Sequence, residues 1–261
     1  MIEQIISRRL RIALPQVQGT VRLLRDGATI PFISRYRKEA TGSLDEVQVG
    51  AVKEQLERLT ELESRRQTIL TTIEEQGKLT PELRRRIEEC WDPVELEDLY
   101  LPYKPKRRTR ATVARERGLE PLADLVMAQR ARDAAQQARR YVSAEVPTPE
   151  DALAGACDII AERISENEQA RNGLRRTFAR EGVVHTKVVK GKEAEGAKYS
   201  DYFDAATPLR SISSHRFLAM RRGADEGVLK ITIDIDADRC IEGLCRQFIR
   251  PGSATRTWME A

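Results

Sequence analysis

The sequence predicts a mainly α-helical fold, a multi-helix array around one long central helix with a small β element near residues 228–236. Charged residues make up 33% of the 261 residues and aromatic residues only 5%, a balance that favours helices over a β-sandwich. Apolar residues recur at helical spacing over most of the chain, and the longest such pattern covers residues 44–76. Residues 228–236 instead alternate apolar and polar side chains, as a strand does.

Three short helices are expected before the long one. Apolar residues recur at helical spacing from Ile2, and we expect Pro15 to end this first helix. A second helix is predicted over Gln16–Leu24 and is followed by an Asp26-Gly27 turn signal. The third is predicted over Ile30–Lys38.

The long helix has clear signals at both ends. Ser43 is followed three residues later by Glu46, the pattern of a capping box. The apolar positions then continue to a stop at Gly77, which makes a helix of about nine turns at 3.6 residues per turn. Such a helix is too long for the interior of a small domain, so we expect it to form a spine on which shorter helices pack.

The remaining helices are marked by caps and prolines. Thr80-Pro81 starts one helix, and Asp92-Pro93 breaks and restarts it. Two prolines and many basic residues predict a loop over residues 101–111. Further helices are expected over residues 112–127, 133–143, 147–164 and 165–180.

The sequence changes character after Gly182. Val183–Val189 is rich in β-branched residues, and a last short helix is expected over Ile241–Ile249. We therefore predict two regions, a helical region over residues 1–182 and a mixed segment over residues 183–261. The final residues start a helix without a stop signal, so we expect the segment to be truncated before a further domain.

Charge is segregated along the chain although the formal net charge is only +4. Residues 82–98 carry seven acids and three bases, whereas residues 101–118 carry seven bases and one acid. Residues 171–192 also carry seven bases and one acid. Local basic surfaces attract polyanions even when the net charge is small, so a nucleic-acid partner is compatible with this pattern.

Neither a metal site, a cofactor nor a catalytic centre is predicted. The four cysteines are scattered, and Cys240 and Cys245 have poor spacing for a zinc half-site, which predicts reduced thiols in a cytoplasmic protein. Ser214 and His215 are neighbours, but no orienting acid is implied, so we do not expect an enzyme. Because no run approaches the ~18 apolar residues of a membrane span, no membrane partner is predicted.

A proline-stiffened basic loop is the first candidate for contact with nucleic acid. Its candidate residues are Tyr103, Lys104, Lys106, Arg107, Arg108 and Arg110. The cations can neutralise phosphates, and the tyrosine can stack on an exposed base. The alternative is that the cations pair with the acidic segment 82–98 and hold the loop to its own helices.

A second candidate group is Arg35, Arg37 and Lys38. Residues so close on a short helix cannot all point the same way, so some of them are expected to be structural. An internal ion pair between Arg35 and Glu39 is one such arrangement. The others remain candidates for auxiliary phosphate contacts.

Four sequence blocks, in order, resemble the Tex family of bacterial transcription accessory proteins, which bind nucleic acid. The blocks cover residues 27–43, 99–110, 190–204 and 208–219. The resemblance implies the N-terminal portion of such a protein, with a helix-turn-helix-like region over residues 1–182. It also implies a later ribonuclease-H-like domain, a helix-hairpin-helix region and an OB-type barrel, the family's main nucleic-acid-binding element.

The sequence therefore predicts a helical scaffold fragment of a nucleic-acid-binding transcription accessory factor. The resemblance implies that the full-length protein binds RNA, with duplex DNA as a further ligand, mainly through domains absent from this chain. The alternative is a protein-interaction module that docks on RNA polymerase or another transcription partner through the spine, with Leu56 and Leu59 in the contact.

Overall fold

The computed structural model describes residues 1–130 and 133–260 and confirms the mainly helical fold class. The chain divides into two compact units, Met1–Lys104 and Pro105–Ala261. The predicted change at Gly182 falls inside the second unit, between a helix and the first strand.

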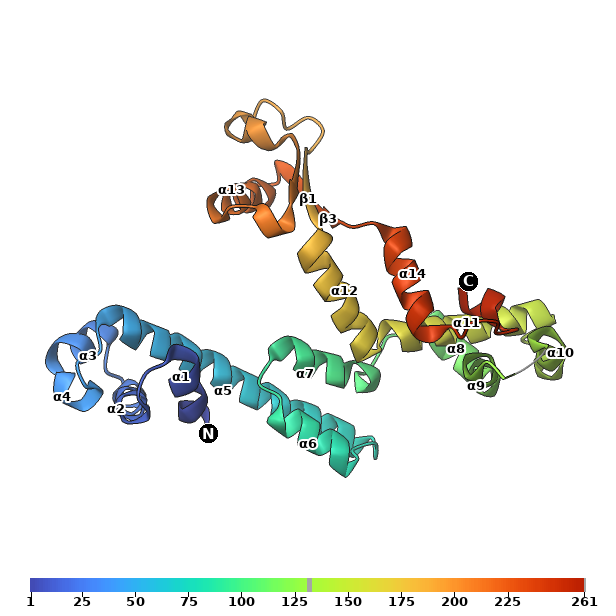
Figure 1. Cartoon of the computed structure of the whole chain (residues 1–261), viewed down its shortest axis with the longest axis horizontal. Coiled ribbons are helices and arrows are strands. Elements are labelled where there is room, and N and C mark those ends of the chain that lie inside the picture. The colour runs from blue at the N-terminus through green and yellow to red at the C-terminus, as the bar shows by residue number, and fades with distance from the viewer. Residues whose placement is uncertain (131–132, 261) are drawn as a thin grey trace. The chain divides into compact units, whose positions relative to one another are not determined.

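The first unit is built on the long helix α5 (Figure 1). Its α-helices are α1 (Ile2–Leu10), α2 (Leu14–Arg25), α3 (Ile30–Tyr36), α4 (Lys38–Thr41), α5 (Glu46–Glu75), α6 (Pro81–Glu89) and α7 (Pro93–Tyr100). Helices α1, α2 and α3 pack against α5, and so do α6 and α7 farther along it. The long helix is thus the predicted spine of this unit.

The core of the first unit follows the apolar face of α5. Val52, Leu59 and Ile69 are buried there with residues of the flanking helices, such as Ile6 and Leu96. Each such fully buried side chain stabilises the fold by roughly 1.5–3 kcal/mol relative to an exposed one. The short helices before α5 and those after it therefore depend on the same apolar face of α5.

Two predicted helix ends are corrected by the structure. The first helix ends at Leu10, and Pro15 lies instead in the first turn of α2, where its missing N–H is not needed. Helix α5 is capped by Asp45, which accepts a hydrogen bond from the Gln48 backbone N–H at 2.7 Å. Ser43, the predicted cap, has a left-handed φ of 66° in the turn before the helix.

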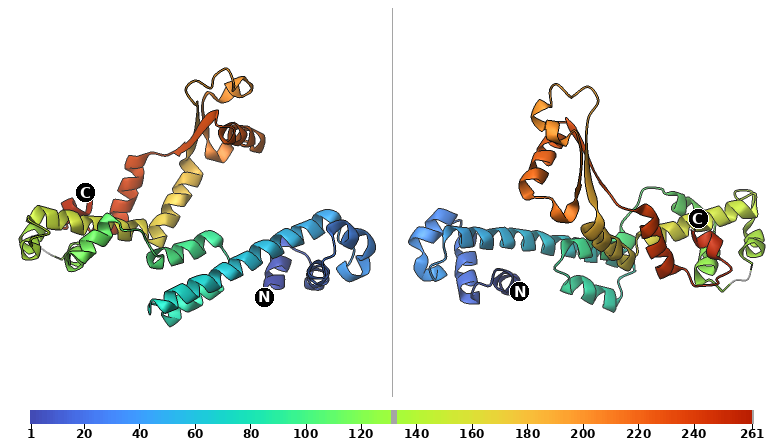
Figure 2. Two further views of the ribbon diagram at one scale, coloured as in Figure 1. Left: turned by 180° about the vertical axis from the view of Figure 1, so that it is seen from behind. Right: turned by 45° about the horizontal axis from the view of Figure 1, so that its top comes forward.

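A close approach between two helices positions α4. A Cβ on Gly19 of α2 would lie 1.9 Å from the carbonyl oxygen of Ala40 in α4. Since that neighbour is backbone and cannot swing away, only glycine allows the contact. The contact holds α4, and with it the residues of the turn after α3, at the outer end of the unit (Figure 2).

The second unit has its own central helix. Its α-helices are α8 (Arg110–Glu116), α9 (Glu120–Ala128), α10 (Ala134–Ala138), α11 (Pro149–Ser165), α12 (Glu168–Glu181), α13 (Ser214–Asp225), α14 (Ala237–Phe248) and α15 (Arg256–Glu260). Helices α8, α9 and α10 pack around α11, which buries Leu153, Ala156 and Ile159 among its core residues. The expected helix over residues 112–127 is two helices, broken at Gly118 with φ 75°.

A small antiparallel sheet lies beyond α12. Its strand order is β2 (Asp204–Pro208), β1 (Val183–Val188), β3 (Leu229–Asp234). The strand candidate near residues 228–236 is confirmed as β3, and β1 matches the β-branched segment. Strand β2 was not predicted, because Asp-Ala-Ala-Thr-Pro has no strand pattern of its own and is extended through its pairing with β1.

Candidate nucleic-acid interface

The basic loop is tied to helix α11 through a nearly buried carboxylate. The side chain of Glu162 is 11% exposed, and its Oε2 lies 3.3 Å from Lys106 Nζ and 2.6 Å from Arg115 Nη1. Thr109 donates a hydrogen bond to Glu162 Oε1 at 3.0 Å, and Lys106 also pairs with Glu166. These contacts anchor the loop inside its own unit.

The charge state of Glu162 reflects this anchoring. Burial is the largest influence and raises the pKa of the carboxyl group, but hydrogen bonds from Arg115, Thr109 and Lys106 outweigh it. The pKa of Glu162 is therefore held below its ordinary value, and the carboxylate stays ionised among its cations.

The remaining arginines of the loop differ in their pairing. Arg108 contacts Glu116 at 2.8 Å, and Arg110 contacts Asp158 at 3.4 Å. Arg107 is exposed and has no ion pair within the ranges 1–130 and 133–260. The loop cations are thus paired, but the predicted partner segment 82–98 is wrong. In the described residues their ion-pair partners are Glu116 of α8, Asp158 and Glu162 of α11, and Glu166 just after α11.

The start of the loop belongs to the first unit. Tyr103 packs against the core, and its carbonyl oxygen accepts a hydrogen bond from Gln76 Nε2 at 2.8 Å. This packing leaves Tyr103 half-buried, so only part of the residue is accessible for stacking. Lys104 is exposed, and its positive charge adds to the main effect of the Arg65 hydrogen bond in lowering the pKa of Glu97.

An exposed group of aromatic and basic side chains lies on α3 and α4. We call it the α3–α4 patch, and it consists of Phe32, Arg35, Tyr36, Arg37 and Lys38. Phe32 is 42% exposed and Tyr36 is 69% exposed, and their ring centroids lie 5.7 Å apart. The Arg37 guanidinium lies 5.8 Å from the centroid of the Phe32 ring.

Ion pairs within the α3–α4 patch are long and exposed. Arg35 reaches Glu46 at 3.8 Å, and Arg37 reaches Glu39 at 3.6 Å. The predicted pair between Arg35 and Glu39 is therefore wrong, since Glu39 faces Arg37 instead. Pairs of this kind contribute about 0–1 kcal/mol, so these arginines remain available to a phosphate. Lys38 is exposed and without an ion pair in the described part of the chain.

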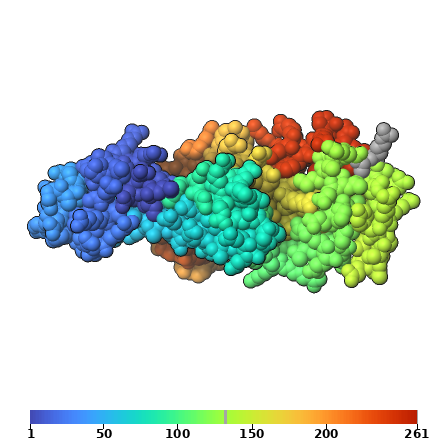
Figure 3. Space-filling view, turned by 90° about the horizontal axis from the view of Figure 1, so that it is seen from below, coloured from blue at the N-terminus to red at the C-terminus, as the bar shows by residue number. Residues whose placement is uncertain are grey.

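The N-terminal segment that includes the α3–α4 patch is basic. Residues 1–41 contain eight Lys and Arg residues and three Asp and Glu residues, a net charge of +5. Helices α1–α4 form a continuous outer surface in the space-filling view (Figure 3). The cations of this patch were predicted from the sequence, whereas Phe32, next to the fully buried Ile33, was not a candidate.

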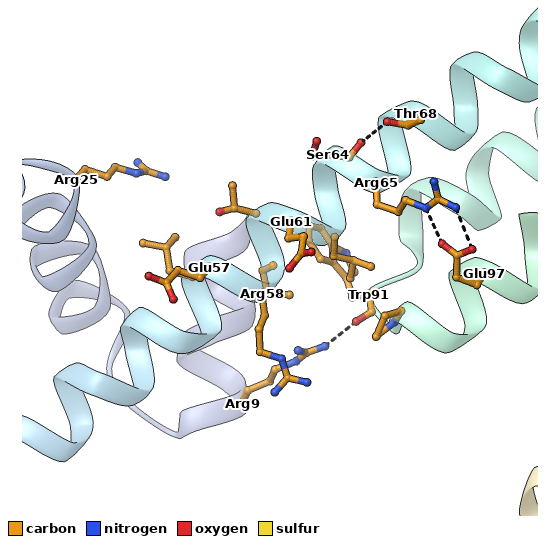
Figure 4. Close-up of a pocket in the computed structure, with 15 residues that line it drawn as sticks. Arg9, Arg25, Glu57, Arg58, Glu61, Ser64, Arg65, Thr68, Trp91 and Glu97 are labelled. Carbon is orange, nitrogen blue, oxygen red and sulfur yellow. Dashed lines mark hydrogen bonds and ion pairs between the residues drawn. The ribbon is translucent and has the colours of Figure 1, made fainter. Parts of the chain in front are cut away.

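The docking face expected on the spine is only partly accessible. Leu59 is buried at 1% exposure, and Leu56 lines a groove of about 1130 Å³ beside α5. Figure 4 shows Arg9 reaching across this groove to donate to the carbonyl oxygen of Trp91 at 2.8 Å. Leu59 therefore belongs to the core, and an interaction hypothesis based on the spine has to use the groove.

Two further observations concern groups that could hold a metal ion or form a catalytic pair. Within residues 1–130 and 133–260, no group of three His, Cys, Asp or Glu side chains is placed to hold a metal ion. His215 lies 3.4 Å from Ser213 through Nε2 and Oγ, a contact local to the start of α13. Across the same described ranges, none of the helices combines the length and apolar character needed to cross a membrane.

Comparisons with known proteins cover both units. Residues 1–74 match the family described as "Tex-like protein N-terminal domain", and residues 129–257 match "Tex central region-like". The first match lies within the first unit and the second within the second unit.

Individual relatives are much longer than this chain. "Transcriptional accessory protein Tex" of Neisseria gonorrhoeae is 47% identical over 237 residues, which are 91% of this chain and 31% of the relative. "Protein tex" of Bordetella pertussis is 49% identical over 225 residues, 85% of this chain and 28% of the relative. The human "S1 RNA-binding domain-containing protein 1" is 28% identical over 269 residues, 97% of this chain and 26% of the relative.

The chain thus spans about a third of the length of the bacterial relatives it matches. Two family matches, in the order N-terminal domain and then central region, agree with the four ordered sequence blocks. This chain belongs to the Tex family of transcriptional accessory proteins.

Proposed function

We propose that this chain is the helical scaffold of a cytoplasmic transcription accessory factor that binds RNA, and that its α3–α4 patch makes an auxiliary contact to nucleic acid. The names of the relatives, a transcriptional accessory protein and an S1 RNA-binding protein, support the general role. The main binding surface is expected in parts of the full-length protein outside residues 1–261. A binding role without catalysis remains the prediction.

The main support for the proposal is that exposed aromatic rings lie beside cations whose ion pairs are long and exposed. Phe32 and Tyr36 present aromatic surface to solvent, although large aromatic side chains are normally buried. A base stacked on such a ring contributes about 1–3 kcal/mol, and neighbouring cations neutralise the flanking phosphates. The α3–α4 patch offers both kinds of group within one short segment.

The basic loop has a smaller part in this proposal. Lys106 and Arg115 are held by Glu162, so removing Lys106 would disturb the fold as well as any binding surface. Lys104 and Arg107 are loop cations that a phosphate can reach without breaking an ion pair seen in the described residues. Docking on RNA polymerase stays the alternative prediction.

The test is a salt series of binding by the 261-residue chain to labelled single-stranded RNA and to duplex DNA. We expect Tyr36→Ala to weaken RNA binding by about 5- to 160-fold, the loss of one stacked base. Lys38→Ala is expected to lower the salt slope by about one, because one phosphate contact is lost. Both side chains are exposed, so the variants should fold as the parent does.

Arg58→Ala provides the matched control for these changes. Arg58 is an exposed cation on α5 whose ion pair with Glu54 is 3.7 Å long, and it lies outside the α3–α4 patch. Its removal should leave the RNA affinity within about twofold, since a surface pair of this kind contributes little. If Tyr36→Ala and Lys38→Ala bind RNA as the parent does, the α3–α4 patch is not a contact site.

A further inference from the structure

Helix α14 is amphipathic, and its apolar face is only partly covered, because Phe248 packs against the core around α11 whereas Ile241 stays exposed. Ile241, Leu244, Cys245 and Phe248 recur at spacings of three and four residues, which places them on one side of the helix. None of the residues of α14 is fully buried, and Ile241 is 54% exposed. A helix of this kind normally gains its stability by burying such a face, as α11 does in the same unit.

This partly covered face lines an apolar groove of about 440 Å³. Its walls come from four helices, with Ile164 of α11, Leu174 of α12, Leu244 and Phe248 of α14, and Trp258 of α15 among them. Cys157 helps to hold one wall, because its Sγ donates to the Trp258 carbonyl oxygen at 3.2 Å. This contact joins α15 to α11 at one wall of the groove.

The residues that line the groove indicate which kind of molecule can bind there. Long aliphatic and aromatic side chains dominate the walls, which does not suit a phosphate backbone. An amphipathic helix that inserts apolar side chains at i, i+3 and i+4 matches such a groove. The occupant is thus expected to be protein.

We propose that this groove receives an amphipathic helix from the part of the full-length protein outside residues 1–261. The relative from Neisseria gonorrhoeae has more than two thirds of its length outside the matched region, since this chain covers 31% of it. A segment of the same polypeptide acts at a high effective concentration, so it occupies the groove without needing the affinity of a separate partner. This inference goes beyond nucleic-acid binding and does not depend on it.

Two cysteines on α14 allow a test with an internal control. Cys245 lines the groove, whereas Cys240 lies on the same helix outside the groove lining, and both are half-buried free thiols. Maleimide labelling of each cysteine is followed by peptide mass spectrometry, in the 261-residue chain and in the full-length protein. We expect Cys245 to react more slowly in the full-length protein by roughly tenfold or more, because labelling then needs local opening.

Variants on α14 separate groove occupancy from general shielding. Leu244→Asp should restore fast labelling of Cys245 in the full-length protein, and Gln247→Asp, outside the groove lining, should not. Circular dichroism checks that both variants keep their helices. Equal Cys245 rates in the two proteins, or equal slowing of Cys240 and Cys245, would overturn the proposal. Concentration-dependent protection of Cys245 in the 261-residue chain would also overturn it, by assigning the groove to a second copy.

Discussion

Replacing Arg66 by alanine is expected to lower the free energy of unfolding by about 3 kcal/mol, because the substitution removes a hydrogen bond to a backbone carbonyl and a cation–π contact that a nearly buried guanidinium makes. The Arg66 side chain is 6% exposed. Its guanidinium donates to the Glu88 carbonyl oxygen at 2.6 Å and lies 4.4 Å from the centroid of the Trp91 ring. These contacts join α5 to the end of α6 and the turn that follows it.

The neighbouring residue gives the control for Arg66. Arg65 makes an ion pair with Glu97 at 2.6 Å, but both side chains are well exposed. Arg65→Ala is therefore expected to cost within about 1 kcal/mol. Urea unfolding followed by circular dichroism measures both variants. Equal losses would show that Arg66 does not anchor α6 to the spine.

Replacing Glu162 by glutamine is expected to lower the stability of the second unit by about 2 kcal/mol at neutral pH, since its hydrogen bonds from Lys106 and Arg115 lose their ionic character. The loop before α8 should then become more accessible to protease. Urea unfolding and limited trypsin digestion measure the two effects. Glu116→Gln is the control, because the pair of Glu116 with Arg108 is exposed on both sides.

The same carboxylate predicts a pH dependence. The pKa of Glu162 is lower in the folded chain than its ordinary value, so its contribution is complete above that ordinary value of about 4.3. The contribution is lost as the pH falls through the lower folded value, because the unfolded chain then binds more protons. The melting temperature of Glu162→Gln should consequently fall less steeply below pH 4.3 than that of the parent. Parallel acid limbs in the two proteins would contradict this assignment.

The helices were predictable where their signals are local. Thr80 and Asp92 cap α6 and α7 as their sequences suggested, and the apolar repeat of α5 continues to Glu75. Strand β2 was not predictable, because its extended form depends on pairing with residues about 20 positions earlier in the chain. The choice of Asp45 over Ser43 as the α5 cap was also beyond the sequence, since both patterns are chemically valid.

At the candidate site, too, local sequence patterns predicted some features and long-range packing decided others. Sequence alone identified the Tex family, the helical class and the cations of both basic segments, because composition and ordered motifs are carried by neighbouring residues. Only the tertiary structure decided which of these cations are held in ion pairs. Glu162 meets Lys106 from more than fifty residues away, and the burial of Ile33 leaves Phe32 and Tyr36 on the surface. Long-range packing determines which charges and rings remain available, and no local pattern records it.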